Sequence, residues 1–186
     1  MTTLSIFHQD QPETAHTVTD NAAEIRELLA RHGVRFEQWP TRDLPDEAAQ
    51  DDILEAYQGE VSALKSECGF QTADVISLNP DHPDKDALRK KFLDEHTHSE
   101  DEVRFFVRGQ GLFYLHFGDQ VLAVLCQKND LISVPDGTRH WFDMGPEPRF
   151  TCIRLFSNPE GWVANFTGAD IAGQLPRYEA LAGAAG

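Results

Sequence analysis

The chain has 186 residues, of which 40% are hydrophobic and 25% charged, a composition that suits one folded domain and excludes global disorder. Asp and Glu number 31 against 16 Lys and Arg, which gives a net charge of -15. Such a chain repels phosphate backbones and anionic lipid, so we expect neither nucleic acid nor a membrane as partner. Its acidity and the lack of an obvious exposed apolar segment favour a monomer.

The three cysteines are widely spaced and odd in number, so we expect reduced thiols rather than a disulfide framework. No apolar run is long enough to cross a bilayer, and the first ten residues lack the pattern of a secretory signal. These features predict a cytoplasmic protein.

The first third of the chain is expected to be largely helical. Asn21 and Glu24 have capping-box spacing, and Gly33 ends the apolar periodicity that follows them. A second helix is predicted to begin near Pro45 and to end at Gly69. Its apolar stripe is Ile53, Tyr57, Val61, Leu64 and Cys68, which we expect to pack on the domain's own core. A short strand is expected at 34–36 between the helices.

The remainder of the chain is predicted to be mainly β, after a strand at 74–78 and a short helix at 84–93. Six short β-rich runs are separated by turns. The runs are 103–107, 112–117, 121–126, 131–134, 140–143 and 150–156. Regularly spaced short strands indicate a barrel or jelly roll. We therefore expect one domain, with helices of 1–69 packed outside a β-barrel core at 70–166 and a C-terminal tail at 167–186. Residues 180–186 are expected to fray.

Four side chains have the spacing of a metal site: His96, His98, Glu102 and His140. On a strand, His96 and His98 point to one face and can address one ion. Glu102 cannot join them on an extended chain, since its Cα would lie about 20 Å from that of His96. The chain must therefore turn between His98 and Glu102, and we expect two strands to meet there while a third brings His140.

Three imidazoles and one carboxylate suit a divalent transition ion such as iron, nickel, copper or zinc. On an octahedral ion these ligands leave positions open for substrate, which favours catalysis over a structural role. We expect the remaining histidines to be ordinary surface or core residues; they are His8, His16, His32, His82 and His116.

The pattern from His96 through Glu102 to Gly109 resembles the first cupin motif, and Pro135-x-Gly137-xx-His140 resembles the core of the second. Three positions depart from the general motifs without touching the ligands; they are Lys90, Asn129 and Met144. The resemblance implies a cupin jelly-roll barrel.

The likeness narrows to the acireductone dioxygenase family. It is carried by Asp94-Glu95-His96-Thr97-His98-Ser99-Glu100-Asp101-Glu102-Val103-Arg104-Phe105-Phe106-Val107, and by 128–132, 134–135, 140–145, 154–156 and 158–162. Residues 36–39 and 74–76 extend it into the N-terminal half, so it covers most of the chain.

That resemblance implies an enzyme that cleaves 1,2-dihydroxy-3-keto-5-methylthiopentene with O2, using one Fe²⁺ or Ni²⁺ ion per chain. The iron form would give formate and 4-methylthio-2-oxobutanoate, as in methionine salvage. The nickel form would give 3-methylthiopropanoate, formate and CO. The ligand set accepts either metal, so the sequence does not choose between them.

Strand parity and family position together favour Arg104 as a stabiliser of the substrate dianion, against a surface arginine on an exposed edge. The expected substrate pocket consists of Phe92, Phe142, Arg154 and Trp162, with Phe105 or Phe106 as further walls. Ordinary core packing is an equal alternative for the aromatic rings, as is a surface salt bridge for Arg154. Glu95 and Asp101 are candidates for orienting the imidazoles or assisting metal loading, against a solvated acidic stretch.

Two other interpretations compete with this one. The first is another mononuclear cupin enzyme, such as a thiol or quercetin-type dioxygenase or a sugar isomerase. The second is a non-catalytic cupin that binds a metal or small ligand; no helix-turn-helix or basic arm supports a transcriptional sensor.

Overall fold

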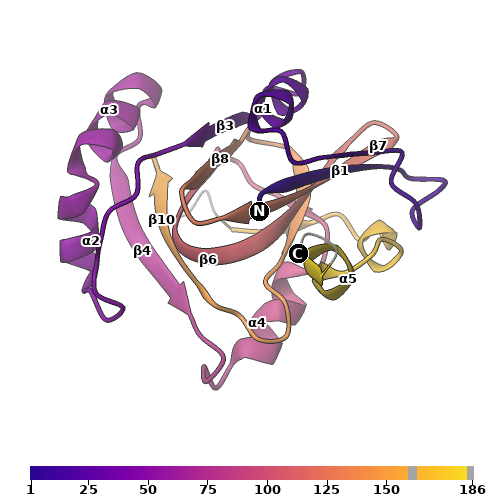
Figure 1. Cartoon of the computed structure of the whole chain (residues 1–186). Helices are drawn as coiled ribbons and strands as arrows, with labels where there is room; N and C mark the ends of the chain where they lie inside the picture. The colour runs from indigo at the N-terminus through magenta and orange to yellow at the C-terminus, as the bar shows by residue number, and fades with distance from the viewer. Residues whose placement is uncertain (159–162, 184–186) are drawn as a thin grey trace.

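The computed structural model describes residues 1–158 and 163–183, whose strands form one continuous open sheet that folds over into a barrel-like shape (Figure 1). The strands are β1 Thr3–His8, β2 Thr17–Thr19, β3 Arg35–Gln38, β4 Thr72–Leu78, β5 His96–Thr97, β6 Glu102–Phe117, β7 Gln120–Gln127, β8 Asp130–Val134, β9 Arg139–Asp143, β10 Phe150–Phe156 and β11 Asn165–Phe166. The helices are α1 Ala22–Ala30, α2 Gln50–Ala56, α3 Gln58–Cys68, α4 Lys85–Phe92 and α5 Tyr178–Gly183, with a 3-10 turn at Ile171–Gly173. The predicted mainly β fold with helices outside is confirmed.

The sheet has two sides, and β6 belongs to both. On one side the strand order is β11-β5-β9-β6-β7-β1-β2. On the other side β6 pairs with β8 and with β10; β8 also pairs with β3, and β10 with β4. All the pairs are antiparallel. Figure 1 shows β6 curving across the barrel between the two sides.

The long strand β6 replaces the two strands that we predicted at 103–107 and 112–117. Gly109, expected in a turn, has φ +69° inside the strand, and the pairing with β10 shifts register beside it. This is a β-bulge, which bends a strand without ending it. A Cβ at position 109 would overlap the carbonyl oxygen of Arg149, so the position accepts only glycine.

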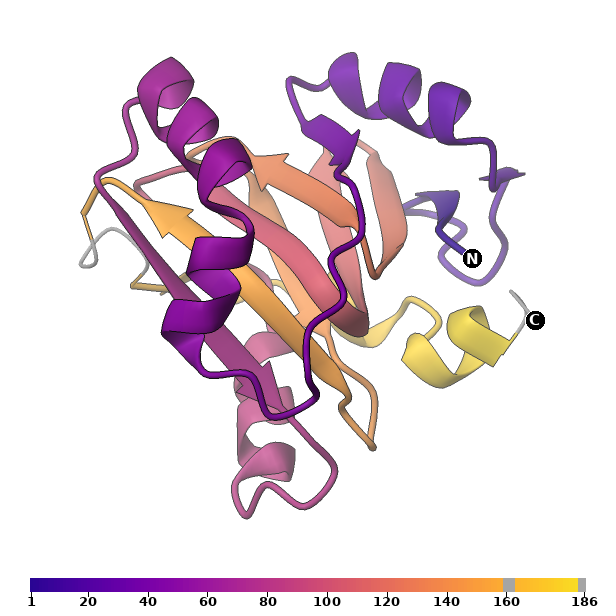
Figure 2. The same cartoon turned by 60° about the vertical axis from the view of Figure 1, so that its left-hand side comes forward.

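The hydrophobic core lies inside the barrel and continues under the elements that cover its two outer faces. The interior contains alternate residues of the strands, such as Phe106, Phe113 and Phe142, together with two residues of α1, Ile25 and Leu29. Helices α2 and α3 cover the outer face of β4 and β10, as Figure 2 shows. The segment from Ile171 to Leu175 covers the outer face of the other side.

The N-terminal third is less helical than we expected. β1 pairs along its whole length with β7, and β2 continues the sheet. Four apolar or small residues at 4–7 are too few to distinguish strand from loop when the partner strand is more than a hundred residues away.

The predicted second helix begins at Gln50 rather than near Pro45 and is divided at Tyr57 into α2 and α3. Its end at Gly69, with φ +80°, is confirmed. Asn21 caps α1 as predicted, but Glu24 accepts from the Thr19 hydroxyl instead of completing the capping box.

The C-terminal tail also contains structure that we did not predict. Helix α5 occupies Tyr178–Gly183, including part of the segment expected to fray, while 184–186 lie outside the described residues. Within the residues that the structure describes, no helix is long and apolar enough to span a membrane.

Candidate metal centre

Three short segments bring the four predicted ligands together. His96 on β5 stands directly opposite His140 on β9, with ring centroids 4.5 Å apart. His98 follows β5 directly, before the bend at 99–100, and Glu102 begins β6 next to Val134 of β8. As predicted, two strands, β5 and β6, flank the turn at 98–102 and a third, β9, brings His140, although β5 pairs with β9 and not with β6. The turn itself is present, and it brings Glu102 back to the histidines.

The ligand atoms converge on one point. The ring nitrogens of His96, His98 and His140 lie within 4.8 Å of one another, and all three residues are buried. A carboxylate oxygen of Glu102, Oε2, lies 3.1 Å from Nε2 of His98 and 3.0 Å from Nε2 of His140. Three nitrogens and one oxygen in this arrangement match the donor set of a divalent transition metal.

Backbone carbonyls orient each imidazole. Nδ1 of His96 lies 2.7 Å from the carbonyl of Asp94, and Nδ1 of His140 lies 2.8 Å from that of Thr138. Nδ1 of His98 lies 3.2 Å from the carbonyl of Val163. Since a carbonyl can only accept, Nδ1 carries a proton in each ring, and Nε2 is the nitrogen that remains for the metal position.

The ionisation states of His96 and Glu102 favour metal binding, whereas in His98 the lowering effect of burial is outweighed by Glu102, which raises the pKa of that ring. Burial, reinforced by nearby His140, lowers the pKa of His96 to about 4, so this ring is neutral at neutral pH. Burial alone would raise the pKa of Glu102. Arg104, His140 and His98 outweigh burial and hold the pKa well below its usual value. A neutral imidazole and an ionised carboxylate are the forms that bind a cation.

Arg104 lies on the same face of β6 as Glu102, as strand parity predicts. Its Nε donates to Oε1 of Glu102 at 2.7 Å, which leaves Oε2 toward the histidines. The guanidinium carbon lies 4.9 Å from the ring centre of Phe142, in a cation–π contact. The arginine is therefore buried and held by the same carboxylate that faces the metal position.

A cavity of about 500 Å³ opens beside the four ligands. Its remaining walls are Ile76, Lys91, Phe92, Arg104, Phe142, Arg154, Val163, Ala164 and Phe166. The walls are thus partly cationic and partly apolar, which suits a small anion with an apolar tail.

Three of the four residues predicted for the substrate pocket, Phe92, Phe142 and Arg154, line this cavity. Trp162, the fourth, lies outside the described residues. Phe105 packs on the outer face under α2 and α3, and Phe106 lies in the barrel interior; neither lines the cavity. Arg154 also forms a two-pronged ion pair with Asp74 of β4.

Glu95 and Asp101 do not orient the ligand imidazoles in the described part of the chain; the backbone carbonyls do. Glu95 follows the opposite parity to His96 and is only 1% exposed. Its carboxylate accepts from Nδ1 of His116 at 2.6 Å and from the Thr167 hydroxyl at 2.7 Å. Asp101 accepts from a backbone amide, that of Asp136, at 3.0 Å.

Our sequence reasoning missed five wall residues, which are Ile76, Lys91, Val163, Ala164 and Phe166. Only Lys91 carried a usable signal, because it precedes Phe92 in a predicted helix whose apolar face must meet the barrel. His116, assigned to the ordinary histidines, is buried, and its Nε2 finds no hydrogen-bond partner among the described residues.

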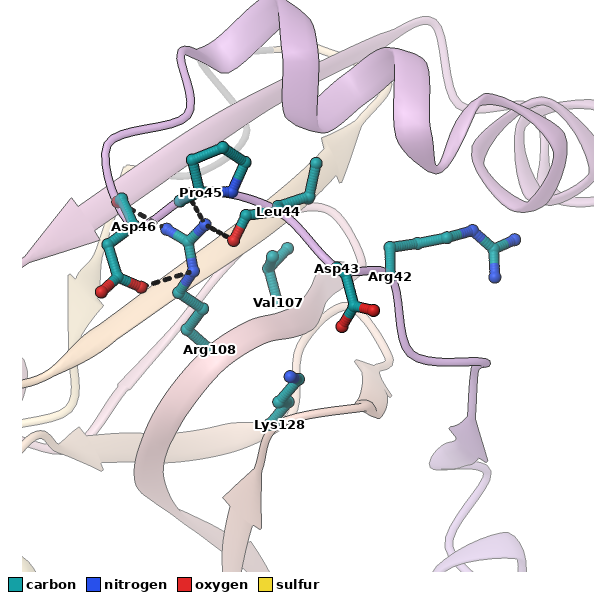
Figure 3. A pocket seen from close by; sticks show the side chains of 8 residues that line it. All are labelled: Arg42, Asp43, Leu44, Pro45, Asp46, Val107, Arg108 and Lys128. Atoms are coloured by element: carbon teal, nitrogen blue, oxygen red, sulfur yellow. Dashed lines mark hydrogen bonds and ion pairs between the residues drawn. The ribbon is translucent and has the colours of Figure 1, made fainter.

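A second cavity, of about 350 Å³, lies elsewhere on the molecule and shares no residue with the metal centre (Figure 3). Arg108 extends into it and donates to the carbonyls of Leu44, Pro45 and Asp46. Figure 3 shows Arg42 directed away from this guanidinium. Arg108 therefore fixes the loop that leads to α2, and its donors are used for that purpose.

The barrel with inward histidines and one carboxylate defines a metal-binding protein of the cupin class. Residues 5–164 match the ARD/ARD′ family, and the chain belongs to that family. It is 76% identical to the acireductone dioxygenase of Marinobacter nauticus, with all of both chains covered. Identity to the acireductone dioxygenase of Hahella chejuensis is 63%, over 97% of this chain and 98% of that one.

A solved structure is also similar. The acireductone dioxygenase from Bacillus anthracis, with a cadmium ion in its active centre, superposes with a TM-score of 0.77 at 32% identity. The match covers 89% of this chain and 98% of that one. These comparisons confirm the family and fold that the sequence motifs indicated.

Proposed function

We propose that this chain cleaves the acireductone 1,2-dihydroxy-3-keto-5-methylthiopentene with O2 at one Fe²⁺ or Ni²⁺ ion. The main support is that three buried imidazoles and one carboxylate converge beside a cavity with cationic and apolar walls. Family membership and the names of the relatives support the reaction.

His96, His98 and His140 would hold the ion through Nε2, and Glu102 through its carboxylate. When bound, the ion supplies Lewis-acid chemistry that favours the anionic form of a substrate with two adjacent oxygens. The carbonyl contacts at each Nδ1 keep the rings in the orientation that this requires.

Arg104 would stabilise the substrate dianion, because its permanent charge lies in the cavity wall next to Glu102. Phe142 restrains the guanidinium and, with Phe92, offers an apolar surface for the methylthio tail. Arg104 and Phe142 are buried, and the low local dielectric around them strengthens these electrostatic interactions. Arg154 contributes a further positive charge to the wall, moderated by Asp74.

Two product sets are compatible with this donor set. We propose formate and 4-methylthio-2-oxobutanoate for the iron form, as methionine salvage requires. For the nickel form we propose 3-methylthiopropanoate, formate and CO. Each set accounts for every atom of the substrate and for both atoms of O2. Imidazole and carboxylate ligands accept both metals, so metal supply would select the products.

We also propose one domain over residues 1–186, a monomer and a cytoplasmic location. Helices and strands of the first 69 residues share the core of the barrel, which supports one domain. The three cysteines are free, which suits a reducing compartment.

The decisive experiment loads the metal-free protein anaerobically with either iron or nickel, measures metal content, and identifies products after acireductone and O2 are added. We expect O2 uptake with both metals and a different product set for each. Absence of O2 uptake by both metal-loaded forms would reject the proposal, and accompanying sugar interconversion would favour a cupin isomerase.

A further inference from the structure

Among the described residues that line the cavity beside the metal centre, three are lysine or arginine, and two of these are already engaged with carboxylates. Arg104 donates to Glu102, and Arg154 forms two hydrogen bonds with Asp74, at 2.8 and 2.5 Å. The third is Lys91, which is exposed at the cavity and makes no hydrogen bond or ion pair with the described residues. Lys91 is therefore the cationic side chain of the three that can bind an incoming anion without first giving up a carboxylate partner.

The position of Lys91 follows from the geometry of α4. Successive residues of a helix are about 100° apart, so Leu88 and Phe92 share the face that packs on the barrel. Arg89 and Lys91 flank this face on opposite sides. Arg89 binds Asp143 of β9 and Glu179 of α5, which fixes the rotation of the helix.

With that rotation fixed, Lys91 can only lie beside Phe92 at the cavity. The intervening residue, Lys90, is directed to solvent and does not line the cavity. The three consecutive basic residues therefore differ in their surroundings: Arg89 is bound to two carboxylates, Lys90 faces solvent and Lys91 faces the cavity.

The net charge of the protein makes the position of Lys91 important for binding an anion. The protein carries a net charge of -15, so an anionic substrate is repelled at long range. A cation at the entrance reverses the local field and raises the local concentration of the anion. We propose that Lys91 captures the anionic substrate at the entrance of the cavity and directs it toward Arg104 and the metal ligands. This inference rests on the proposed function, because it assumes an anionic acireductone.

A structural explanation of Lys91 makes a different prediction. Basic residues in the last turn of a helix stabilise its C-terminus through the helix dipole. Lys90 lies in the same turn and would have the same effect, so Lys90→Gln is a matched control.

The test compares iron-loaded wild-type protein with Lys91→Gln, Lys91→Arg and Lys90→Gln. We expect Lys91→Gln to raise KM for the acireductone roughly threefold to tenfold at low ionic strength, with kcat and metal content almost unchanged. Added salt should shrink the difference, because exposed charges are screened. Lys91→Arg should restore KM, and Lys90→Gln should behave as wild type.

Calorimetric titration of the same proteins with the acireductone in the absence of O2 should show the same loss of affinity in Lys91→Gln alone. Equal KM values in Lys91→Gln and Lys90→Gln, or a difference that salt leaves unchanged, would overturn the inference. Failure of the wild type to consume O2 would instead reject the proposed reaction, while the titration would still report whether Lys91 binds the anion.

Discussion

Removing the buried carboxylate of Glu95 should destabilise the protein, although its partners in the described residues, His116 and Thr167, are not among the proposed metal ligands. The carboxylate joins three segments on the outer face of the sheet, since it holds His116 of β6 and the Thr167 hydroxyl beyond β11. The backbone adds to this connection, because the carbonyl of Glu95 accepts from the amide of Thr167 at 3.0 Å. The side chain therefore fixes the strand that carries His96.

The expected cost follows from burial. Glu95→Ala leaves Nδ1 of His116 and the hydroxyl of Thr167 without their acceptor, in a ring whose Nε2 already has none among the described residues. Leaving the buried Nδ1 of His116 without an acceptor costs about 1–3 kcal/mol, and loss of the Thr167 hydrogen bond costs about 1 kcal/mol more. For a chain of this size, each kcal/mol lowers Tm by about 2–4 °C, so we expect a decrease of about 10 °C.

Thermal unfolding of the metal-free protein measures this effect, with Asp101→Ala as the control. Asp101 contacts one backbone amide near the surface, and its loss should cost less than about 1 kcal/mol. Metal titration should also show weaker binding in Glu95→Ala, because β5 is less firmly held. A Tm within about 2 °C of wild type would refute the idea that Glu95 anchors this strand, since that shift corresponds to at most about 1 kcal/mol.

Further substitutions test the ligands, the arginine and the bulge. His96→Ala and His140→Ala should each abolish metal retention and turnover; stoichiometric metal in either purified variant would contradict the ligand assignment. Arg104→Ala should retain metal but lower kcat/KM by roughly tenfold to a hundredfold, because a charge in the cavity wall is lost; full activity with full metal content would exclude its role. Gly109→Ala should lower the unfolding free energy by at least about 3 kcal/mol through overlap and a left-handed backbone, whereas Gly59→Ala in the open should not destabilise the protein.

Chelation provides a separate test of the metal centre. A bound metal stabilises the folded state by about 2.7 kcal/mol when its free concentration is a hundred times its Kd. Removal should therefore lower Tm, and re-addition of either metal should restore it. An identical unfolding curve with and without metal would mean that these side chains do not bind it in the folded state.

The convergence of the four proposed ligands was predictable because their geometry is local or nearly so. His96 and His98 obey strand parity, and a short polar bend is enough to return the chain to Glu102. Parity also placed Arg104 beside Glu102. The family motifs supplied His140, whose approach from β9 depends on a pairing that no local pattern specifies.

The cavity walls were harder to predict because they depend on tertiary contacts. Ile76 comes from β4, Lys91 from α4 and Phe166 from the two-residue strand β11. Each of these elements meets the others only through the barrel. Strand β1 was not predicted for the same reason, because its pairing partner β7 is distant in sequence. The partners of Glu95 were also not predicted, because they are 21 and 72 residues away.

The bulge in β6, whose extra residue is Val107, shows why alternation that holds at the start of the strand fails along its whole length. At the start of the strand, even-numbered Arg104 and Phe106 face the interior; beyond the bulge, odd-numbered Phe113 and Leu115 do so. If side chains alternated without interruption along β6, the phenylalanine rings of one half of the strand would point out of the barrel. The extra residue lets one strand supply polar groups to the cavity at one end and apolar core to the barrel at the other. Gly109 follows this extra residue by two positions, and its left-handed backbone beside the carbonyl of Arg149 is part of the same irregularity, which lets Glu102 and the packed interior share a strand.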